Sequence, residues 1–124
     1  MAGSANDGTD VRAAVERFNE GFNAKDIQAV MQCMTEDCIF ESTAPPDGGR
    51  FTGQEAVRSC FQSFFESSPE AEFEGEEMFV AADRCVVRWV YRYGDGATAG
   101  HVRGVDVIRV RNGKVAEKLA YVKG

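Results

Sequence analysis

Residues 100–124, "GHVRGVDVIRVRNGKVAEKLAYVKG", hold two strand patterns that meet at Asn112 and Gly113. Apolar side chains alternate with other residues on both sides of this dipeptide, and a period of two is typical of a β-strand with one buried face. Asn-Gly is also a favoured dipeptide for a tight hairpin turn. The stretch therefore predicts an antiparallel hairpin with strands at residues 101–111 and 114–122. The pattern leaves Asp106 unexplained, because a buried carboxylate is costly unless it is paired.

Helical spacing governs the first half of the chain. Apolar residues three or four positions apart predict a first helix from Asp10, as its N-cap, to about Asn23, and a second helix that follows Asp26. Thr52 and Glu55 have the spacing of a capping box, which predicts the start of a third helix.

Strand spacing governs the second half and one short earlier segment. Residues 72–79 and 84–93 alternate like the hairpin strands, and "CIFES" at residues 38–42 predicts a short strand before the third helix. Helices followed by antiparallel strands indicate the α+β class, with three helices packed on a curved, antiparallel or mixed sheet. We expect residues 10–124 to form one domain and residues 1–9 to be a flexible tail.

Composition excludes several classes of partner. The chain has 124 residues and a net charge of −6, which disfavours nucleic acid and anionic membranes as partners. It has no apolar run of about 18 residues and no secretory pattern at its start, so we expect a cytoplasmic protein. The four cysteines lack metal-ligand spacing and the chain has one histidine, so no metal site is expected.

Charged residues assign the two faces of the predicted sheet. Glutamates alternate along one strand and arginines along the next, and opposite charges on neighbouring strands stabilise a solvent-facing surface. The opposite face carries Trp89 and Tyr91 and, by the same alternation, Asp106. Burial among aromatic side chains raises the pKa of a carboxyl group, which makes Asp106 a candidate acid, base or hydrogen-bond donor.

The length of the hairpin turn decides what lies opposite Asp106. With a two-residue turn, Asp106 faces Leu119, whereas a three-residue loop that ends in Gly113 places Lys118 opposite it. In the second register, Asp106 and Lys118 form a buried pair. Such a pair serves equally well as a catalytic centre or as a purely structural contact.

Three segments carry a resemblance to a known family: "FNAKDIQAVMQCMTEDCIFES" at residues 22–42, "GQEAV" at residues 53–57 and "RGVDVIRVRNGKVAEKLAYV" at residues 103–122. With the order of elements, they resemble the nuclear transport factor 2 (NTF2)-like superfamily and, within it, the SnoaL-like domain. This group is related to ketosteroid isomerase and limonene epoxide hydrolase. The resemblance covers residues 11–122 and implies a cone-shaped α+β fold, with a homodimer formed through the outer face of the sheet. It also implies that Ala120 and Val122 face inward, so we favour the three-residue hairpin loop, in which Lys118 lies opposite Asp106.

The resemblance transfers only part of the known active sites. Asp106 aligns with the protonated carboxylic acid by which ketosteroid isomerases stabilise an enolate. The position of their catalytic base holds Ser42, and that of their oxyanion-hole tyrosine holds Phe18. The epoxide hydrolases use two aspartates bridged by an arginine, and Asp106 is the only aspartate expected on the inner face. Neither familiar mechanism is therefore expected.

The predicted function is a small-molecule isomerase, cyclase or hydrolase that acts by acid/base chemistry without a cofactor. Its substrate is expected to be an apolar or polycyclic molecule. The catalytic candidates are Asp106, Lys118 and Tyr91, with Glu41, Ser42 and His101 as further candidates near the mouth of the cone. The candidate pocket residues are Phe18, Phe22, Phe40, Phe61, Trp89 and Ile108. The alternative is a non-catalytic ligand-binding or dimerisation module in which Asp106 is structural.

Overall fold

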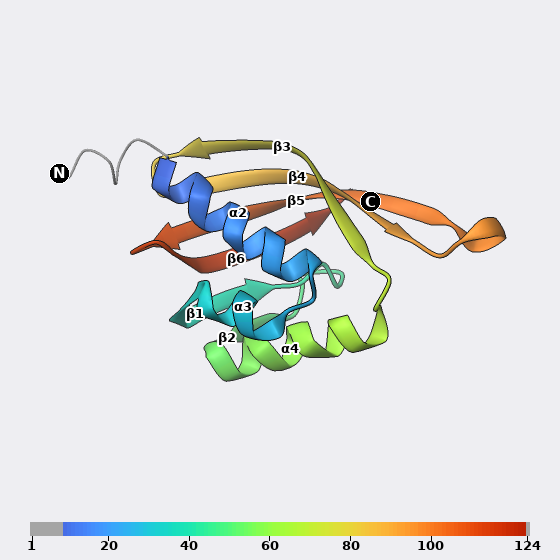
Figure 1. Ribbon diagram of the computed structural model, residues 1–124, viewed down its shortest axis with the longest axis horizontal. Helices are drawn as coiled ribbons and strands as arrows, with labels where there is room; N and C mark the ends of the chain where they lie inside the picture. The colour runs from blue at the N-terminus through green and yellow to red at the C-terminus, as the bar shows by residue number, and fades with distance from the viewer. Residues whose placement is uncertain (1–8, 124) are drawn as a thin grey trace.

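A computed structural model describes residues 9–123, in which three α-helices accompany one six-stranded mixed sheet (Figure 1). The tail predicted for residues 1–9 lies outside the described residues, except that Thr9 already belongs to the first helix. The helices are α2 (Thr9–Asn23), α3 (Ile27–Gln32) and α4 (Gln54–Ser67). The strands are β1 (Met34–Glu41), β2 (Arg50–Thr52), β3 (Glu72–Ala81), β4 (Arg84–Tyr93), β5 (Gly100–Arg111) and β6 (Lys114–Val122), with a short 3-10 turn at Gly96–Thr98.

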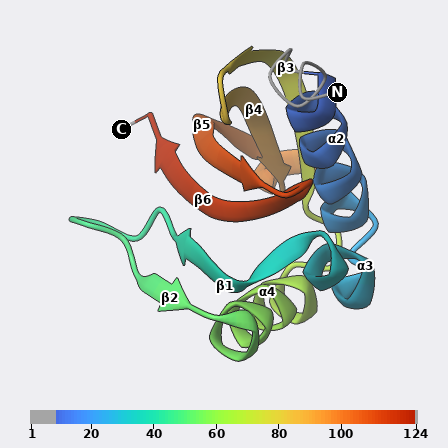
Figure 2. The same cartoon turned by 90° about the vertical axis from the view of Figure 1, so that its left-hand side faces the viewer.

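The sheet curves around the helices, with the strands in the order β2-β1-β6-β5-β4-β3 (Figure 2). Helix α2 lies across the concave side of β3 to β6, whereas α4 packs beside β1 and β2. The core fills the space between these layers, and its largest fully buried side chains are Phe18, Phe61, Met34 and Ile108. Within the described residues, no helix is both long and apolar enough to cross a membrane.

The first strand differs from its prediction. It begins at Met34 and not at Cys38, because β1 runs parallel to β6 and Met34 already pairs with Val115. Two strands, β1 and β2, therefore separate α3 from α4, and the helices do not form one N-terminal group. Strand β2 was not predicted, because it has three residues and follows a segment rich in proline and glycine.

One of the three predicted helix starts is confirmed. The Asp26 carboxylate caps α3 by accepting a hydrogen bond of 3.1 Å from the Ala29 backbone N–H. Asp10 is not an N-cap, because α2 begins one residue earlier. The predicted capping box is wrong, because Thr52 is held in β2 and Gly53, with φ of 91°, is the N-cap of α4.

The hairpin between β5 and β6 combines a short turn with a bulge. Asn112 and Gly113 have φ of 53° and 76°, the left-handed conformation of a two-residue turn, so the favoured three-residue loop is wrong. Val110 pairs with Val115, but Arg109 pairs with Glu117, which leaves Ala116 as an extra residue in β6.

The bulge reverses the alternation in the rest of β6. The residue opposite Asp106 is therefore Ala120, and neither Leu119 nor Lys118 as predicted. Lys118 lies opposite Ile108, which shares the inner face with Asp106. The two-residue turn and the bulge together place Lys118 on the inner face with Asp106, and neither predicted register included this combination.

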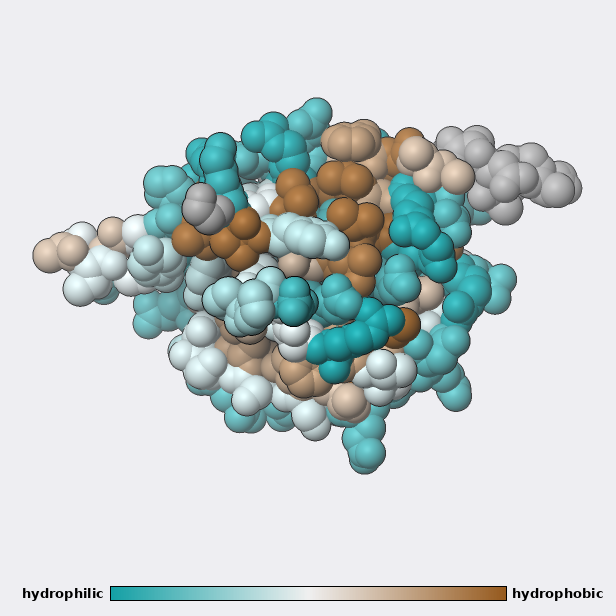
Figure 3. Space-filling view, turned by 180° about the vertical axis from the view of Figure 1, so that it is seen from behind, coloured by the Kyte–Doolittle hydropathy of each residue, from teal (hydrophilic) through white to brown (hydrophobic). Residues whose placement is uncertain are grey.

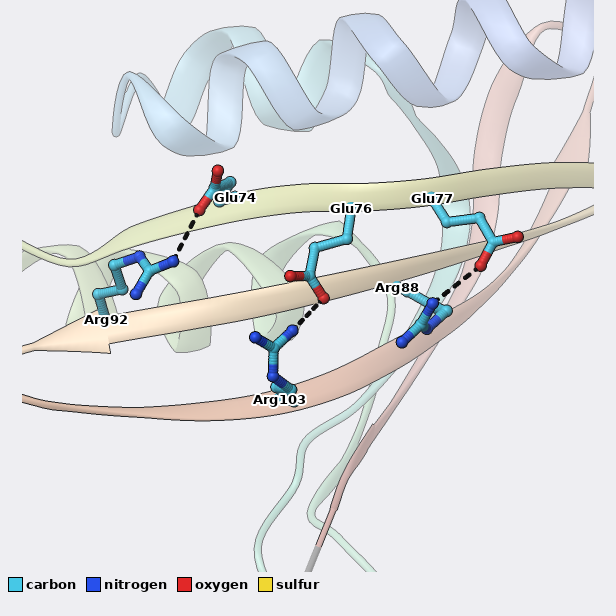
Figure 4. Close-up of polar contacts among 6 residues, drawn as sticks. All are labelled: Glu74, Glu76, Glu77, Arg88, Arg92 and Arg103. Atoms are coloured by element: carbon cyan, nitrogen blue, oxygen red, sulfur yellow. Dashed lines mark hydrogen bonds and ion pairs between the residues drawn. The ribbon is translucent and has the colours of Figure 1, made fainter.

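The outer face of the sheet carries the predicted rows of opposite charge. Glu74 and Arg92 approach to 3.1 Å, Glu77 and Arg88 to 3.0 Å, and Glu76 pairs with Arg103 (Figure 4). Apolar side chains gather in the middle of this face, surrounded by polar ones (Figure 3). The exposed residues Phe79 and Tyr121 also lie on this face. This surface is called the outer face below.

Candidate functional site

A cavity of about 500 Å³ lies inside the cone, between α2, α4 and the inner face of the sheet. Nearly half of its lining residues are aromatic, and the exposed residues Thr43 and Val122 lie at its mouth. The wall also holds Asp106 and Lys118. Its remaining lining residues are Phe22, Phe40, Ser42, Cys60, Phe61, Phe64, Phe73, Trp89, Tyr91, Val102 and Ala120.

Asp106 and Lys118 form a buried ion pair in this wall. They are 6% and 7% exposed, and the Lys118 Nζ lies 3.7 Å from the Asp106 Oδ2. This separation allows strong electrostatic attraction but is too long for a direct hydrogen bond. Each group therefore keeps hydrogen-bonding capacity that a bound molecule can use.

Four phenylalanine rings surround the Lys118 ammonium. Its Nζ lies 4.2 Å from the ring centroid of Phe22, 5.2 Å from that of Phe18 and 5.6 Å from those of Phe40 and Phe61. The negative faces of aromatic rings attract a cation, most strongly where water is excluded. The rings therefore help to keep an ammonium group in an apolar wall.

Burial raises the pKa of the Asp106 carboxyl above its ordinary value, and the nearby Lys118 ammonium opposes this rise without cancelling it. The Trp89 indole N–H lies beside the carboxyl and also favours its ionised form, although it makes no hydrogen bond of normal geometry there. A carboxyl whose pKa is raised holds its proton to higher pH than an ordinary aspartate and can donate that proton to a bound molecule. Asp106 thus has the electrostatic setting of a general acid or base.

Trp89 is held between two glycines. It pairs with Gly75 on β3 and with Gly104 on β5, and its ring leans over Gly104. A Cβ atom added to Gly104 would lie 2.5 Å from the Trp89 ring, which is closer than any allowed contact. The missing side chain at Gly104 therefore sets the position of the indole beside Asp106.

The predicted pocket residues divide into two groups. Phe22, Phe40, Phe61 and Trp89 line the cavity as expected. Phe18 and Ile108 do not line it, because both are fully buried in the core behind it. Phe18 still contributes through its ring, which contacts the Lys118 ammonium.

Tyr91 lies in the cavity wall, where its ring stacks on Phe73 at a centroid distance of 4.8 Å. Among residues 9–123, no hydrogen bond joins the Tyr91 hydroxyl to Asp106, so that hydroxyl is available to a ligand.

The candidates near the mouth are not all brought to the cavity. Ser42 lines it, and its hydroxyl oxygen accepts a hydrogen bond of 2.9 Å from the Gly49 N–H. Glu41 points away and pairs with Arg50 on β2. His101 is exposed at the start of β5, on the outer face and outside the cavity.

Several lining residues were not assigned to the pocket from the sequence. For Cys60 and Phe64 the available signal was helical spacing, because they lie one position before and three positions after the predicted pocket residue Phe61. Phe73 could not be assigned to the pocket from its sequence pattern. Strand alternation predicts which face of the sheet it occupies but not its distance from the cavity. Burial raises the pKa of the Cys60 thiol, although the nearby Lys118 cation opposes this rise. The raised pKa favours the protonated thiol. Within the described residues, no cluster of three or more histidine, cysteine or acidic side chains is suited to a metal ion.

Comparisons with known proteins agree with this architecture. The SnoaL-like domain family matches residues 15–118. An NTF2-like protein of unknown function from Mesorhizobium loti is 36% identical, with a TM-score of 0.80 over 93% of this chain and 92% of its own. No curated protein matches the sequence.

Two more distant structures share the fold. A putative polyketide cyclase from Sinorhizobium meliloti is 16% identical, with a TM-score of 0.72 over 87% of this chain and 93% of its own. TerC, co-crystallised with polyporic acid, is 17% identical, with a TM-score of 0.79 over 93% of this chain and 92% of its own. The family match spans most of the chain and agrees with the close relative and the cone-shaped fold, so this protein belongs to the SnoaL-like family of NTF2-like proteins.

Proposed function

We propose that this protein is a small-molecule enzyme that isomerises, cyclises or hydrolyses an apolar or polycyclic substrate by acid/base chemistry. The observation that carries the proposal is the ion pair of Asp106 and Lys118 in the wall of an aromatic cavity. The proposal requires no cofactor.

The two charged groups suit complementary roles in such a reaction. The ionised Asp106 takes a proton from the substrate, or its protonated form donates one. The Lys118 ammonium, 3.7 Å away, stabilises negative charge that develops on a substrate oxygen. The Tyr91 hydroxyl, also in the wall, supplies a further hydrogen bond to the substrate.

Binding is the first step to test, and the chain contains a single tryptophan for this purpose. Trp89 lies in the cavity wall, so a ligand that enters should change its fluorescence. Polyporic acid, with which TerC was co-crystallised, is a reasonable first probe. Ligands that bind can then be screened for conversion to product.

The decisive variant is Asp106→Asn, which keeps the shape of the side chain and removes its proton transfer. We expect turnover of a screened substrate to fall by about 10²- to 10⁴-fold while binding persists. Glu72→Gln makes the same chemical change at an exposed position and should leave turnover intact. Turnover by Asp106→Asn at the rate of the unmodified protein would refute the catalytic role.

A second candidate function is a non-catalytic ligand-binding module. It is favoured by Ser42 and Phe18, which occupy the positions of the base and the tyrosine in the isomerases that the chain resembles. In that case ligands quench Trp89 but none is converted, and Asp106→Asn changes only stability. Turnover measurements on bound ligands separate the two functions.

We also propose that two copies associate through the outer face. This face places exposed Phe79 and Tyr121 near rows of glutamate and arginine, which a second copy related by a two-fold axis can match.

A further inference from the structure

A second, much smaller cavity touches the same ion pair from the side of α2 and β3. It measures about 60 Å³, and it shares Phe22, Phe73, Trp89, Asp106 and Lys118 with the large cavity. The residues that belong to the small cavity alone are Asn19, Asn23, Gly75 and Val87. We call this space the niche.

The niche exists because of the two glycines beside Trp89. The indole leans toward β5 over Gly104, so it leaves the space on the β3 side free. On that side stands Gly75, where an added Cβ atom would meet nothing within 4 Å. Gly75 and Asn23 are both exposed, so the niche reaches the surface between them.

Polar groups without partners line this space. The Trp89 Nε1 is buried and makes no hydrogen bond in the described part of the chain. The half-buried Asn19 amide also has no hydrogen-bond partner among residues 9–123. The Asn23 amide, in contrast, is paired with the backbone, because it donates to the Phe73 carbonyl at 3.0 Å and accepts from the Phe73 N–H at 3.2 Å.

Such a site suits water. A buried water takes about 30 Å³ and needs two to four polar partners, so the niche has room for about two. The Trp89 N–H, the Asn19 amide and the Asp106 carboxyl provide these partners. An apolar ligand gains little there, since the space is small and its free groups are polar.

We propose that the niche is a water site that connects Asp106 to bulk solvent while a substrate fills the large cavity. A proton that Asp106 takes from the substrate then passes to a niche water and on to solvent, which restores the carboxylate. In the reverse direction, a proton from solvent passes through the niche water to Asp106 and restores its protonated form. This role rests on the proposed function, but the presence of the water does not.

The first test is a high-resolution crystal structure of the unmodified protein and of Gly75→Val. Valine is compatible with a strand and fills the niche without a backbone clash, since the space beside Gly75 is open. We expect ordered water within hydrogen-bond distance of Trp89 Nε1 and Asp106 in the unmodified protein, and none in Gly75→Val. A dry niche in the unmodified protein would overturn the proposal.

The second test measures the connection to solvent by NMR titration of the Asp106 carboxyl carbon. The titratable groups around this carboxyl are Lys118 on β6, Tyr91 on β4 and Cys60 on α4, and none of them is changed. Loss of the niche water completes the burial of Asp106, so Gly75→Val should raise its apparent pKa by about half a unit or more. An unchanged titration in Gly75→Val would contradict the proposal.

Ala81→Val is the matched control, because it adds bulk at an exposed position of the same strand far from the niche. It should leave both the water and the titration unchanged. If Gly75→Val does not fold, Gly75→Ala provides the same comparison with less bulk. If the niche holds water but the protein converts none of the ligands that bind, the proposed enzymatic function is refuted and the proposed water site is not.

Discussion

At the scale of single residues, Asp106 and Lys118 are tolerated in the interior because each offsets the cost of burying the other. An isolated buried charge costs several kcal/mol, and a close opposite charge recovers part of this cost. The aromatic rings around Lys118 and the indole N–H beside Asp106 add to the compensation. Strand alternation was enough to predict that Asp106 faces inward, whereas its contact with Lys118 depended on the details of the hairpin.

Lys118→Met should make stability depend on pH over a wider range. The pKa of Asp106 is raised in the folded state, so the folded protein holds a proton that the unfolded chain has already released. The free energy of unfolding therefore falls as pH rises from the ordinary aspartate pKa to the raised one. Without Lys118 the pKa rises further, so the fall continues to higher pH. We expect a loss of about 3 kcal/mol at neutral pH and less in acid, measured by urea unfolding.

The control is the double variant Asp106→Asn with Lys118→Met. It has no buried carboxyl to titrate, so this pH dependence should disappear and much of the stability should return. If Lys118→Met unfolds with the same pH dependence as the unmodified protein, the two groups do not interact as their distance implies.

Gly104→Ala should displace Trp89 from Asp106. The added methyl group would lie 2.3 Å from the Tyr121 backbone oxygen and 2.5 Å from the indole ring, so both the ring and β6 must shift. We expect a loss of at least about 1–3 kcal/mol together with a shift in Trp89 fluorescence. Gly75→Ala is the matched control on the other side of the same tryptophan, where the space is open. It should change stability by less than about 1 kcal/mol. Equal effects of the two variants would mean that Trp89 does not rest on Gly104.

At the scale of elements, a bulge explains why the register of the hairpin was not predicted. The four long strands follow from their alternation, to within two residues at each end. An extra residue inside a strand and an extra residue in a turn produce similar sequence patterns, so the hairpin register was assigned incorrectly. One signal was present, because Val115 and Ala116 are consecutive apolar residues, and both are buried.

Insertion of one alanine between Glu117 and Lys118 should break the pair of Asp106 and Lys118. With the bulge at Ala116 retained, the inserted residue would lie opposite Ile108, and Lys118 would lie opposite Val107, on the outer face. Asp106 would then lose its cation. We expect at least about 3 kcal/mol of destabilisation by urea unfolding. Ala116→Gly leaves the register unchanged and should cost about 1 kcal/mol or less. An equally small effect of the insertion would mean that the register of β6 does not determine the contact between Lys118 and Asp106.

At the scale of the whole molecule, the order of helices and strands predicted the α+β class. The family resemblance added the prediction that the sheet and helices form a cone. The parallel contact of β1 with β6 was not predictable from local pattern, because it joins segments more than 70 residues apart. The cavity was also not predictable from local pattern. Its lining comes from two helices, α2 and α4, and five strands. Alternation gives the face of each side chain but not where the layers separate.

Tyr121→Glu should weaken the proposed dimer without unfolding the subunit. Tyr121 is 53% exposed on the outer face, so the change costs the isolated subunit little, whereas a second copy would bury the new charge. We expect the unmodified protein to be a dimer by size-exclusion chromatography with light scattering, and the variant to dissociate at least about 30-fold more readily, equivalent to about 2 kcal/mol. Tyr93→Glu changes a tyrosine that is 45% exposed at the far end of β4 and should remain dimeric. A monomeric unmodified protein, or a Tyr121→Glu dimer of unchanged affinity, would exclude the outer face as the contact between subunits.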